Sequence, residues 1–151
     1  MNIQLLVCGR LKKGAHFDLF QDYLKRMDWG VQVHEIESRH KDQGKIHTDE
    51  CAQILERINS QSYVIAMDER GKTLPSRKLA AKFQGLQNES RSNVQIIIGG
   101  ADGLNDEIRC RADFLLSFGQ QTWPHLLARV MLLEQIYRAQ QILAGHPYHR
   151  E

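Results

Sequence analysis

Hydrophobic and polar positions along this chain alternate between two periods, which predicts strands and helices in turn. Short runs of apolar, mostly branched residues that end at glycine or polar residues predict five strands. We expect these strands at residues 3–8, 31–36, 63–67, 94–98 and 114–118. The segments between them carry apolar side chains at helical spacing, which predicts helices at residues 16–27, 48–60, 76–86, 106–110 and 124–144. This alternation is typical of an α/β fold with a mostly parallel sheet flanked by helices.

The polar segments set the expected helix starts and one loop. Thr48 and Ser76 have side chains that cap helices, so we expect helices to begin at these two positions. Residues 37–47 are rich in Lys, Arg, His and Gln, and we expect them to form a mobile surface loop.

The last predicted helix is apolar on more than one face. A helix that is apolar nearly all round is buried on several sides. Because an outer helix of a single domain should keep one face in water, we expect part of this surface to meet a second copy of the chain in a homodimer. A central helix of a monomer is the alternative. The apolar side chains are Leu126, Leu127, Val130, Met131, Leu132, Leu133, Ile136, Tyr137, Ile142 and Leu143.

Three polar or glycine-rich segments each follow a predicted strand at its carboxyl end. They are residues 68–72, 99–103 and 119–124. In open parallel sheets, ligands bind outside the carboxyl ends of the strands. The glycines of these segments let the backbone approach a ligand closely, although turns without any ligand are the alternative. If the three strands are neighbours, the loops converge on one crevice, which is our candidate ligand site.

Composition narrows the class of protein. The chain has 151 residues, 42% hydrophobic and 25% charged, which indicates a single globular domain over residues 1–151. Its apolar runs are far shorter than the ~20 residues that span a bilayer, and the N-terminus lacks the basic start of a secretion signal. We therefore expect a cytoplasmic protein without a membrane segment. The three cysteines are expected to be buried, and the seven histidines lack metal-site spacing, so no metal is expected.

Several nucleotide-binding classes are disfavoured by the position of the glycines. Residues 8–14, after the first strand, match neither the dinucleotide fingerprint nor the phosphate-binding loop. The glycine cluster at 99–103 follows the fourth strand, which also argues against a Rossmann-type methyltransferase. The net charge of +2 permits a polyanionic partner without requiring one. A basic cluster near the N-terminus is by itself more typical of a solvated face; it comprises Arg10, Lys12, Lys13, Lys25 and Arg26.

Polar and aromatic side chains gather toward the carboxyl terminus. His125 stands at the start of the last helix, where its ring could face either the crevice or solvent. The tail, residues 145–151, is dense in groups that stack or donate hydrogen bonds. Because chain ends usually fray, a tail without a function is the alternative.

Four motifs carry a resemblance to a known family. They are Ile98-Gly-Gly-Ala-Asp-Gly-Leu104, Leu116-Ser-Phe-Gly-Gln-Gln-Thr-Trp-Pro-His125, Glu134-Gln-Ile-Tyr-Arg-Ala139 and His146-Pro-Tyr-His-Arg-Glu151. In this order and spacing the chain resembles the ribosomal large-subunit methyltransferase H family over essentially its whole length. That family belongs to the SPOUT class, and the resemblance implies a homodimer and a C-terminal trefoil knot, a rare exception to unknotted topology. It also implies S-adenosylmethionine as cofactor and methylation of N3 of a pseudouridine in 23S ribosomal RNA.

The resemblance further implies which residues bind the cofactor. Many family members differ from this chain at positions 119–121, a change that contacts through the backbone would tolerate. The implied cofactor contacts are Met67, Gly99, Phe118, Gly119, Gln120, Gln121, Thr122 and Trp123.

For catalysis, our hypothesis is that Tyr148, His149 and Arg150 close over the target nucleotide, within one chain or across the dimer. No general base is identified. Arg138 and His125 are candidate RNA-binding residues. Because a net charge of +2 without a separate RNA-binding domain should bind naked RNA poorly, we expect the substrate to be 23S rRNA within assembled ribosomes or large subunits.

Two functions of other classes stay open. The first is a non-enzymatic, ribosome-associated factor that senses a ligand in the crevice, and it would tolerate loss of the cofactor loop. The second is a small flavodoxin-like protein in which residues 99–103 bind phosphate. Such a protein would bind mononucleotides in preference to S-adenosylmethionine.

Overall fold

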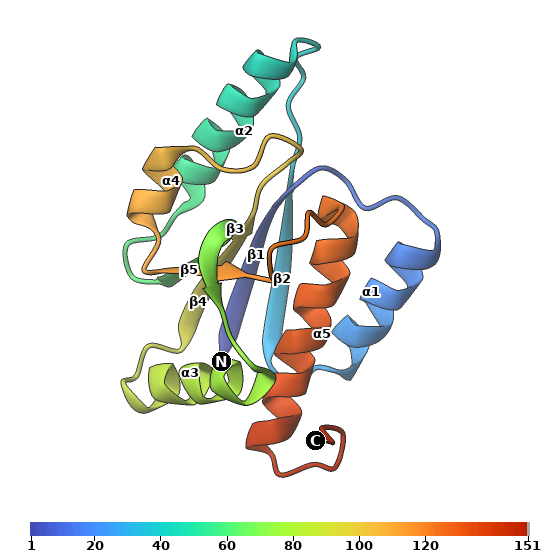
Figure 1. Cartoon of the computed structure of the whole chain (residues 1–151), viewed down its shortest axis with the longest axis vertical. Coiled ribbons are helices and arrows are strands. Elements are labelled where there is room, and N and C mark those ends of the chain that lie inside the picture. Colours follow the sequence, from blue (N-terminus) through green and yellow to red (C-terminus); the bar gives the residue numbers. More distant parts are fainter. Residues whose placement is uncertain (151) are drawn as a thin grey trace.

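The computed structural model, which describes residues 1–150, contains one five-stranded parallel sheet flanked by helices (Figure 1). The strand order is β2-β1-β4-β3-β5, and every adjacent pair is parallel. The strands are β1 (Asn2–Cys8), β2 (Gly30–Ile36), β3 (Tyr63–Thr73), β4 (Asn93–Ile98) and β5 (Phe114–Ser117). The helices are α1 (Ala15–Arg26), α2 (Gln43–Arg57), α3 (Ser76–Asn88), α4 (Asp106–Arg111) and α5 (His125–Leu143). The predicted α/β class and the predicted order of elements are confirmed.

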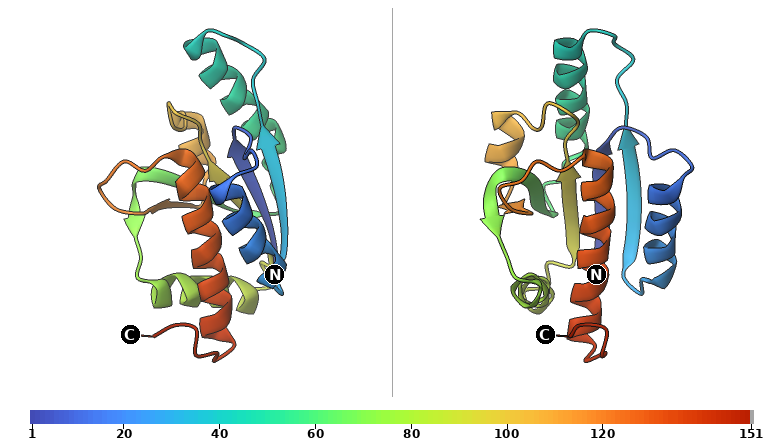
Figure 2. Two further views of the ribbon diagram at one scale, coloured as in Figure 1. Left: turned by 90° about the vertical axis from the view of Figure 1, so that its right-hand side faces the viewer. Right: turned by 45° about the vertical axis from the view of Figure 1, so that its right-hand side comes forward.

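The two faces of the sheet bury two separate hydrophobic cores. Alternate residues of β1 point to opposite faces, so Leu5 packs with α1, α3 and α5 while Leu6 packs with α2 and α4. Figure 2 shows α1, α3 and α5 on one side of the sheet and α2 rising past its carboxyl end on the other. Strands buried on both faces explain the continuous runs of apolar residues in β1 and β4. Within α3, the predicted apolar face of Leu79, Phe83 and Leu86 is buried.

Three local expectations need correction. Helix α2 begins at Gln43 instead of Thr48, because the Asp42 side chain accepts a hydrogen bond from the Lys45 backbone N–H. The second half of segment 37–47 is therefore helical and not loop. The N-cap of α3 is Pro75, and the Ser76 hydroxyl donates instead to Gln135 Oε1 on α5 at 2.8 Å.

Strand β3 also continues beyond its predicted end at Met67. Residues 68–72, expected as a loop, lie within β3. The pairing with β5 is interrupted after Met67 and resumes at Lys72 and Thr73. Gly71 crosses the backbone of β5 so closely that a Cβ atom would lie 2.7 Å from the Leu115 carbonyl. This part of β3 pairs only with the edge strand β5, so its polar residues need not be buried in the sheet.

Two of the three cysteines are buried. Cys8 and Cys51 are buried and free, as expected. Cys110 is exposed, so the prediction that it is buried is wrong. Within residues 1–150, no helix has both the length and the apolar character needed to cross a membrane.

Candidate functional site

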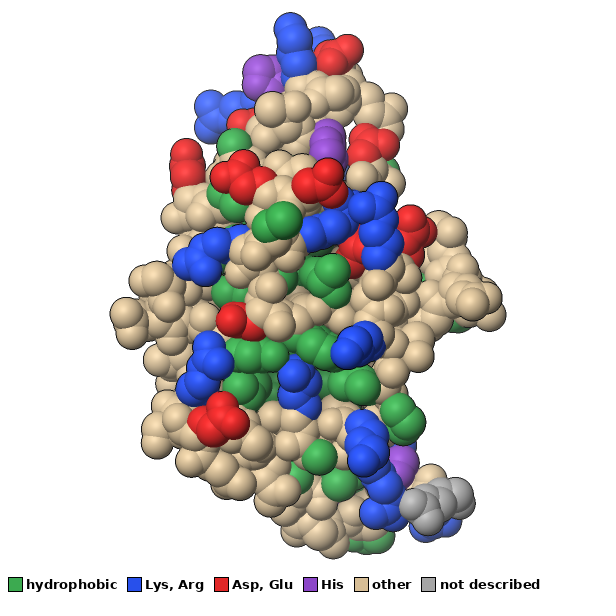
Figure 3. Space-filling model, turned by 60° about the vertical axis from the view of Figure 1, so that its left-hand side comes forward, with side chains coloured by type: hydrophobic (Ala, Val, Ile, Leu, Met, Phe, Trp, Pro, Cys, Tyr) green, Lys and Arg blue, Asp and Glu red, His purple; other side chains and the backbone are tan. Residues whose placement is uncertain are grey.

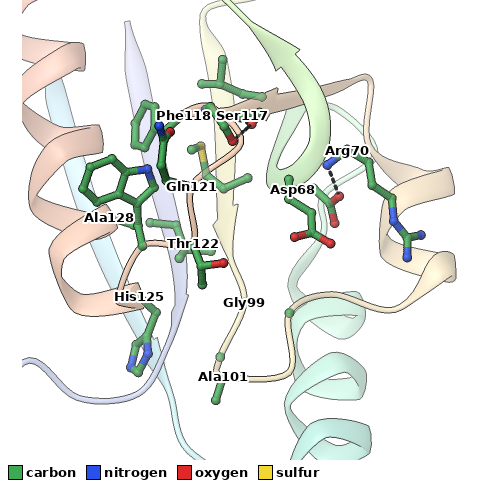
Figure 4. A pocket seen from close by; sticks show the side chains of 18 of the residues that line it. Asp68, Arg70, Gly99, Ala101, Ser117, Phe118, Gln121, Thr122, His125 and Ala128 are labelled. Atoms are coloured by element: carbon green, nitrogen blue, oxygen red, sulfur yellow. Dashed lines mark hydrogen bonds between the residues drawn. The ribbon is translucent and has the colours of Figure 1, made fainter.

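The carboxyl ends of β4 and β5 and the irregular part of β3 after its predicted end enclose a crevice of about 420 Å³ (Figure 4). These three strands are neighbours in the sheet, so the predicted convergence of their following segments is confirmed. The volume is within the range of small-molecule sites, roughly 300–1,000 Å³. The start of α5 completes the wall through His125 and Ala128.

The crevice has an apolar half and a charged half. Its apolar half is formed by side chains from all three strand ends. Asp68 and Arg109 form the charged half, with Oδ2 and Nε 2.7 Å apart, and the Asp68 side chain is only 5% exposed. Asp68 Oδ1 also accepts the Arg70 backbone N–H at 2.9 Å, so both carboxylate oxygens hold the irregular part of β3 in place. The apolar lining comprises Met67, Ile98, Leu116, Phe118 and Trp123.

Glycines allow two of the lining loops to fold tightly. A Cβ on Gly99 would lie 2.7 Å from the carbonyl of Gly103, closer than real Cβ contacts come. Gly119 has a φ of 112°, and its turn is closed by Ser117, whose Oγ accepts from the Gly119 N–H at 3.1 Å and donates to its carbonyl at 3.0 Å. At these glycines the loops present backbone groups to the crevice, beside side chains such as Phe118 and Trp123.

His125 lines the crevice from α5, beside a buried arginine. Burial lowers the pKa of His125 below its ordinary value, and the positive charge of Arg129 lowers it further. Arg129 is 1% exposed; its Nη1 donates to Glu35 Oε1 at 2.9 Å, and its Nη2 donates to the carbonyls of Cys8 and Gly9. This arginine fastens the start of α5 to the ends of β1 and β2.

The tail forms an ordered cluster on the last turns of α5. The Tyr148 hydroxyl donates to Glu134 Oε1 at 3.1 Å and lies 3.5 Å from the hydroxyl of Tyr23. Its ring packs edge-on against Tyr137, with centroids 4.9 Å apart. Burial raises the pKa of Tyr148, so the phenol is protonated near neutral pH.

Two arginines extend this cluster. The Arg138 guanidinium pairs with Glu134, stacks 4.8 Å from the centre of the Tyr148 ring, and lies 3.4 Å from His149 Nδ1. Arg26 from α1 lies 4.5 Å from the centre of the Tyr137 ring. The tail is thus held by aromatic and charged side chains, and residues 146–149 do not form a frayed end.

Within one chain, the tail and the crevice lie apart. His125 is the first residue of α5, and the tail folds back along the second half of this helix as far as Glu134. Glu134 follows His125 by nine residues, which is about 14 Å of helix at 1.5 Å per residue. Figure 1 shows the chain leaving the lower end of α5, whereas β1 and β2 end near the start of that helix.

The structure therefore divides the predicted site residues into two groups. The crevice group includes His125 and all the predicted cofactor residues except Gln120, which is exposed and outside the lining. Arg138 and the tail residues form the second group. Sequence analysis missed the Asp68–Arg109 pair and Arg129; only the position of Asp68 directly after a strand offered a signal. Within residues 1–150, no cluster of His, Cys, Asp and Glu could hold a metal ion.

A second hollow, about 590 Å³ in volume, lies between α1, α5 and the start of α3. Its lining is mostly apolar and includes Leu127 and Met131 from α5 and Leu19 from α1. Leu19 is 46% exposed, one of two large hydrophobic side chains exposed in the described chain. The other, Trp123, lines the crevice just before the start of α5.

Comparison with known proteins gives a consistent result. Residues 1–149 match the family described as predicted SPOUT methyltransferase. A Rhodospirillum centenum protein named ribosomal RNA large subunit methyltransferase H is 44% identical over 151 residues, covering 99% of both chains. A Zymomonas mobilis protein of the same name is 40% identical and covers 100% of this chain and 99% of its own.

Solved structures share the fold at low sequence identity. A methylase family protein from Haemophilus influenzae aligns with a TM-score of 0.58 and 13% identity, over 99% of this chain and 71% of its own. A structure from Legionella pneumophila, described as a methyltransferase in complex with the bound cofactor SAM, aligns with a TM-score of 0.51 and 17% identity. That alignment covers 93% of this chain and 66% of the other.

Proposed function

The chain belongs to the SPOUT methyltransferase family, and on this premise we propose that it transfers a methyl group from S-adenosylmethionine to ribosomal RNA. The observation that carries the proposal is the crevice at three neighbouring strand ends, in a chain matched over nearly its whole length by named methyltransferases. The finer assignment, to N3 of a pseudouridine in 23S rRNA, follows the sequence resemblance and the names of these relatives.

The residues of the crevice fit the proposed cofactor. Apolar walls suit a flat purine ring, and the backbone groups that Gly99 and Gly119 expose can bind its polar edges. Because these contacts run through the backbone, the Gly119-Gln120-Gln121 sequence can replace the residues that other family members carry there. We propose Met67, Gly99 and residues 118–123 as the cofactor-binding segment, with Gln120 contributing through its position in the turn.

The proposed chemistry depends more on how the protein positions the methyl donor and the acceptor than on reactive side chains. When bound, S-adenosylmethionine supplies a methyl group on a positively charged sulfur, which makes it an electrophile. The crevice must hold the donor, and the chain must hold the acceptor nitrogen in line with it. Alignment of this kind can contribute roughly 7–11 kcal/mol to catalysis. The proton of N3 must also leave, and the neutral imidazole of His125, which lines the crevice, can contact the RNA there.

We propose that the active form is a homodimer in which each crevice is completed by the partner's tail. Two observations support it. The tail packs against Glu134 and Tyr137, about 14 Å or more along α5 from His125, and does not line the crevice of its own chain. The apolar hollow that exposes Leu19 runs along α1 and α5, where a second copy would bury it.

Within such a dimer, the tail would supply hydrogen-bond donors and positive charge to the target nucleotide. Tyr148 is protonated and therefore acts as a donor and not as the base. His149 and Arg150 are proposed to contact the RNA beside it. Arg138, already stacked on Tyr148 and paired with Glu134, is proposed to set the tail in place and to bind phosphate.

Three further features belong to this proposal. A C-terminal trefoil knot is proposed for the fold, supported by the close crossing of β3 over β5 at Gly71. The modest net charge of +2 favours assembled ribosomes or large subunits over free RNA as substrate. Such a substrate places the protein in the cytoplasm.

Labelled methyl transfer tests the function directly. The protein would be incubated with labelled S-adenosylmethionine and assembled ribosomes, free large subunits or a short RNA hairpin, and the modified nucleoside identified by mass spectrometry. We expect N3-methylpseudouridine from assembled particles and little from the hairpin. A ligand-sensing factor would bind the cofactor without transfer, and a flavodoxin-like protein would bind mononucleotides in its place.

A further inference from the structure

The loop between β1 and α1 carries a concentrated positive charge. We call residues 10–16 the basic loop: it contains Arg10, Lys12, Lys13 and His16, and no acidic residue. All of its side chains except Leu11 are exposed. Together with Leu126 of α5, the loop lines a shallow hollow of about 390 Å³.

The base of this loop is rigidly held. The Leu11 backbone N–H donates to Glu35 Oε1 at 2.7 Å, and the same oxygen accepts from Arg129. Arg129 also binds the carbonyls of Cys8 and Gly9, where the loop leaves the sheet. An ion pair between buried Arg129 and partly exposed Glu35 thus fixes the backbone from which the exposed lysines project, before any partner binds.

The basic loop borders the crevice through one residue. His125 lines the crevice, and its Nε2 would lie 3.4 Å from a Cβ placed on Gly9, at the base of the loop. Figure 4 shows the His125 ring between the crevice and the chain that leaves β1. A nucleic-acid strand with its target base held against the cofactor at the mouth of the crevice, beside His125, would have the basic loop within reach of its neighbouring phosphates.

The lysines of the basic loop are free to bind phosphate. Arg10 pairs with Glu37 at 3.4 Å, but Lys12 and Lys13 have no ion-pair partner among residues 1–150. An exposed lysine without a partner can neutralise a phosphate and release the counterions around it, which is the main source of affinity for nucleic acid.

The cations beside α3 differ in this respect. On the face that carries α3, α4 and β5, Lys and Arg side chains surround exposed hydrophobic groups (Figure 3). Lys82 lies 4.1 Å from the centre of the Phe114 ring, and Arg91 stacks on Tyr63 and pairs with Asp113 at 3.8 Å. These cations cover aromatic surface in the folded chain.

We propose that the basic loop binds the sugar-phosphate backbone of the RNA strand next to the methylated nucleotide. The proposal rests on the proposed function, and it adds a contact surface outside both the crevice and the tail. Lys12 and Lys13 supply the charge, and the Arg129–Glu35 pair holds the loop at the crevice edge. RNA phosphates are the occupant, because the surface offers cations beside a site where one base is to be held.

The test is the double variant Lys12→Gln/Lys13→Gln, assayed for sedimentation with ribosomes at several salt concentrations and for methyl transfer. Each lost phosphate contact should reduce the slope of log affinity against log salt by about 1, so the double variant should lose about 2. Its KM for ribosomes should rise severalfold, while kcat and cofactor affinity remain those of the wild type. Lys12→Arg/Lys13→Arg should restore the affinity.

The matched control is Lys78→Gln/Lys82→Gln, which removes the same charge from α3 and should change the salt slope little. An unchanged slope in the loop variant, or an equal loss in the control, would overturn the proposal. Sedimentation does not depend on turnover. If the protein binds ribosomes through the loop but transfers no methyl group, the proposed function would be contradicted, while the proposed RNA-binding role of the loop would still be supported. A wild-type chain that does not bind ribosomes would overturn both.

Discussion

The two ends of helix α5 are built in different ways. At its start, the crevice is shaped by tight backbone turns that depend on Gly99 and Gly119, with side chains from three strands on its walls. At its end, the tail cluster is formed by side chains, with Tyr148, Arg138 and Glu134 in mutual contact. A backbone-built site tolerates changes of side chain as long as the turns survive, whereas a side-chain cluster depends on each member. We propose that the active site needs both.

The largest expected effect comes from removing the tail, which should abolish most methyl transfer and leave cofactor binding intact. Deletion of residues 146–151 should reduce methyl transfer by a factor of about 10³ or more, because the proposed donors to the nucleotide are lost. Cofactor affinity should stay within about twofold, since no tail residue lines the crevice of the same chain. Rapid-quench transfer assays and calorimetric titration with S-adenosylmethionine measure the two quantities. A truncated chain with full transfer activity would remove the tail from the mechanism.

A smaller effect is expected from adding one methyl group to the crevice. Gly99→Ala would place a Cβ atom 2.7 Å from the backbone of Gly103, so the loop must shift. Overpacking of this kind costs roughly 1–3 kcal/mol, and we expect weaker cofactor binding together with a lower free energy of unfolding. Gly85→Ala in α3 is the matched control. It has open space around it and should stabilise the helix by about 1 kcal/mol.

The smallest effect concerns pH. The pKa of His125 is lower in the folded chain than its ordinary value of 6.5, because burial and Arg129 disfavour the charged imidazole. The unfolded chain therefore binds a proton that the folded chain resists, so His125 reduces stability as the pH falls below 6.5 and not above it. Urea unfolding at pH 7.5 and 5.5 should show a smaller loss on acidification for His125→Asn than for the wild type. His34→Asn, on the exposed side of β2, is the control; equal losses in both variants would remove His125 from this effect.

The sequence was most informative where one physical factor dominated. Strands β1 and β4 were predictable because burial on both faces demands continuous apolar runs, and the crevice because glycines followed three strands. The start of α2 was missed because both Asp42 and Thr48 could cap a helix and only the structure selects Asp42.

Long-range partners were out of reach. The polar residues that extend β3 pair with β5, some 40 residues later in the chain, and no local pattern records such pairing. Arg129 looks like any polar residue on a helix until Glu35 and two carbonyls surround it. The distance between tail and crevice likewise depends on which end of α5 meets the sheet edge.

Mixed dimers give the most direct test of the composite site. One variant would lack residues 146–151, and the other would carry Thr122→Trp, an exposed position where a large ring fills the crevice. Each should be inactive as a homodimer. If each crevice uses the partner's tail, equal mixing and subunit exchange should restore up to about a quarter of wild-type methyl transfer, because half the dimers are mixed and each holds one intact site. No activity after verified exchange would contradict the composite site and place the tail and the crevice in the same chain.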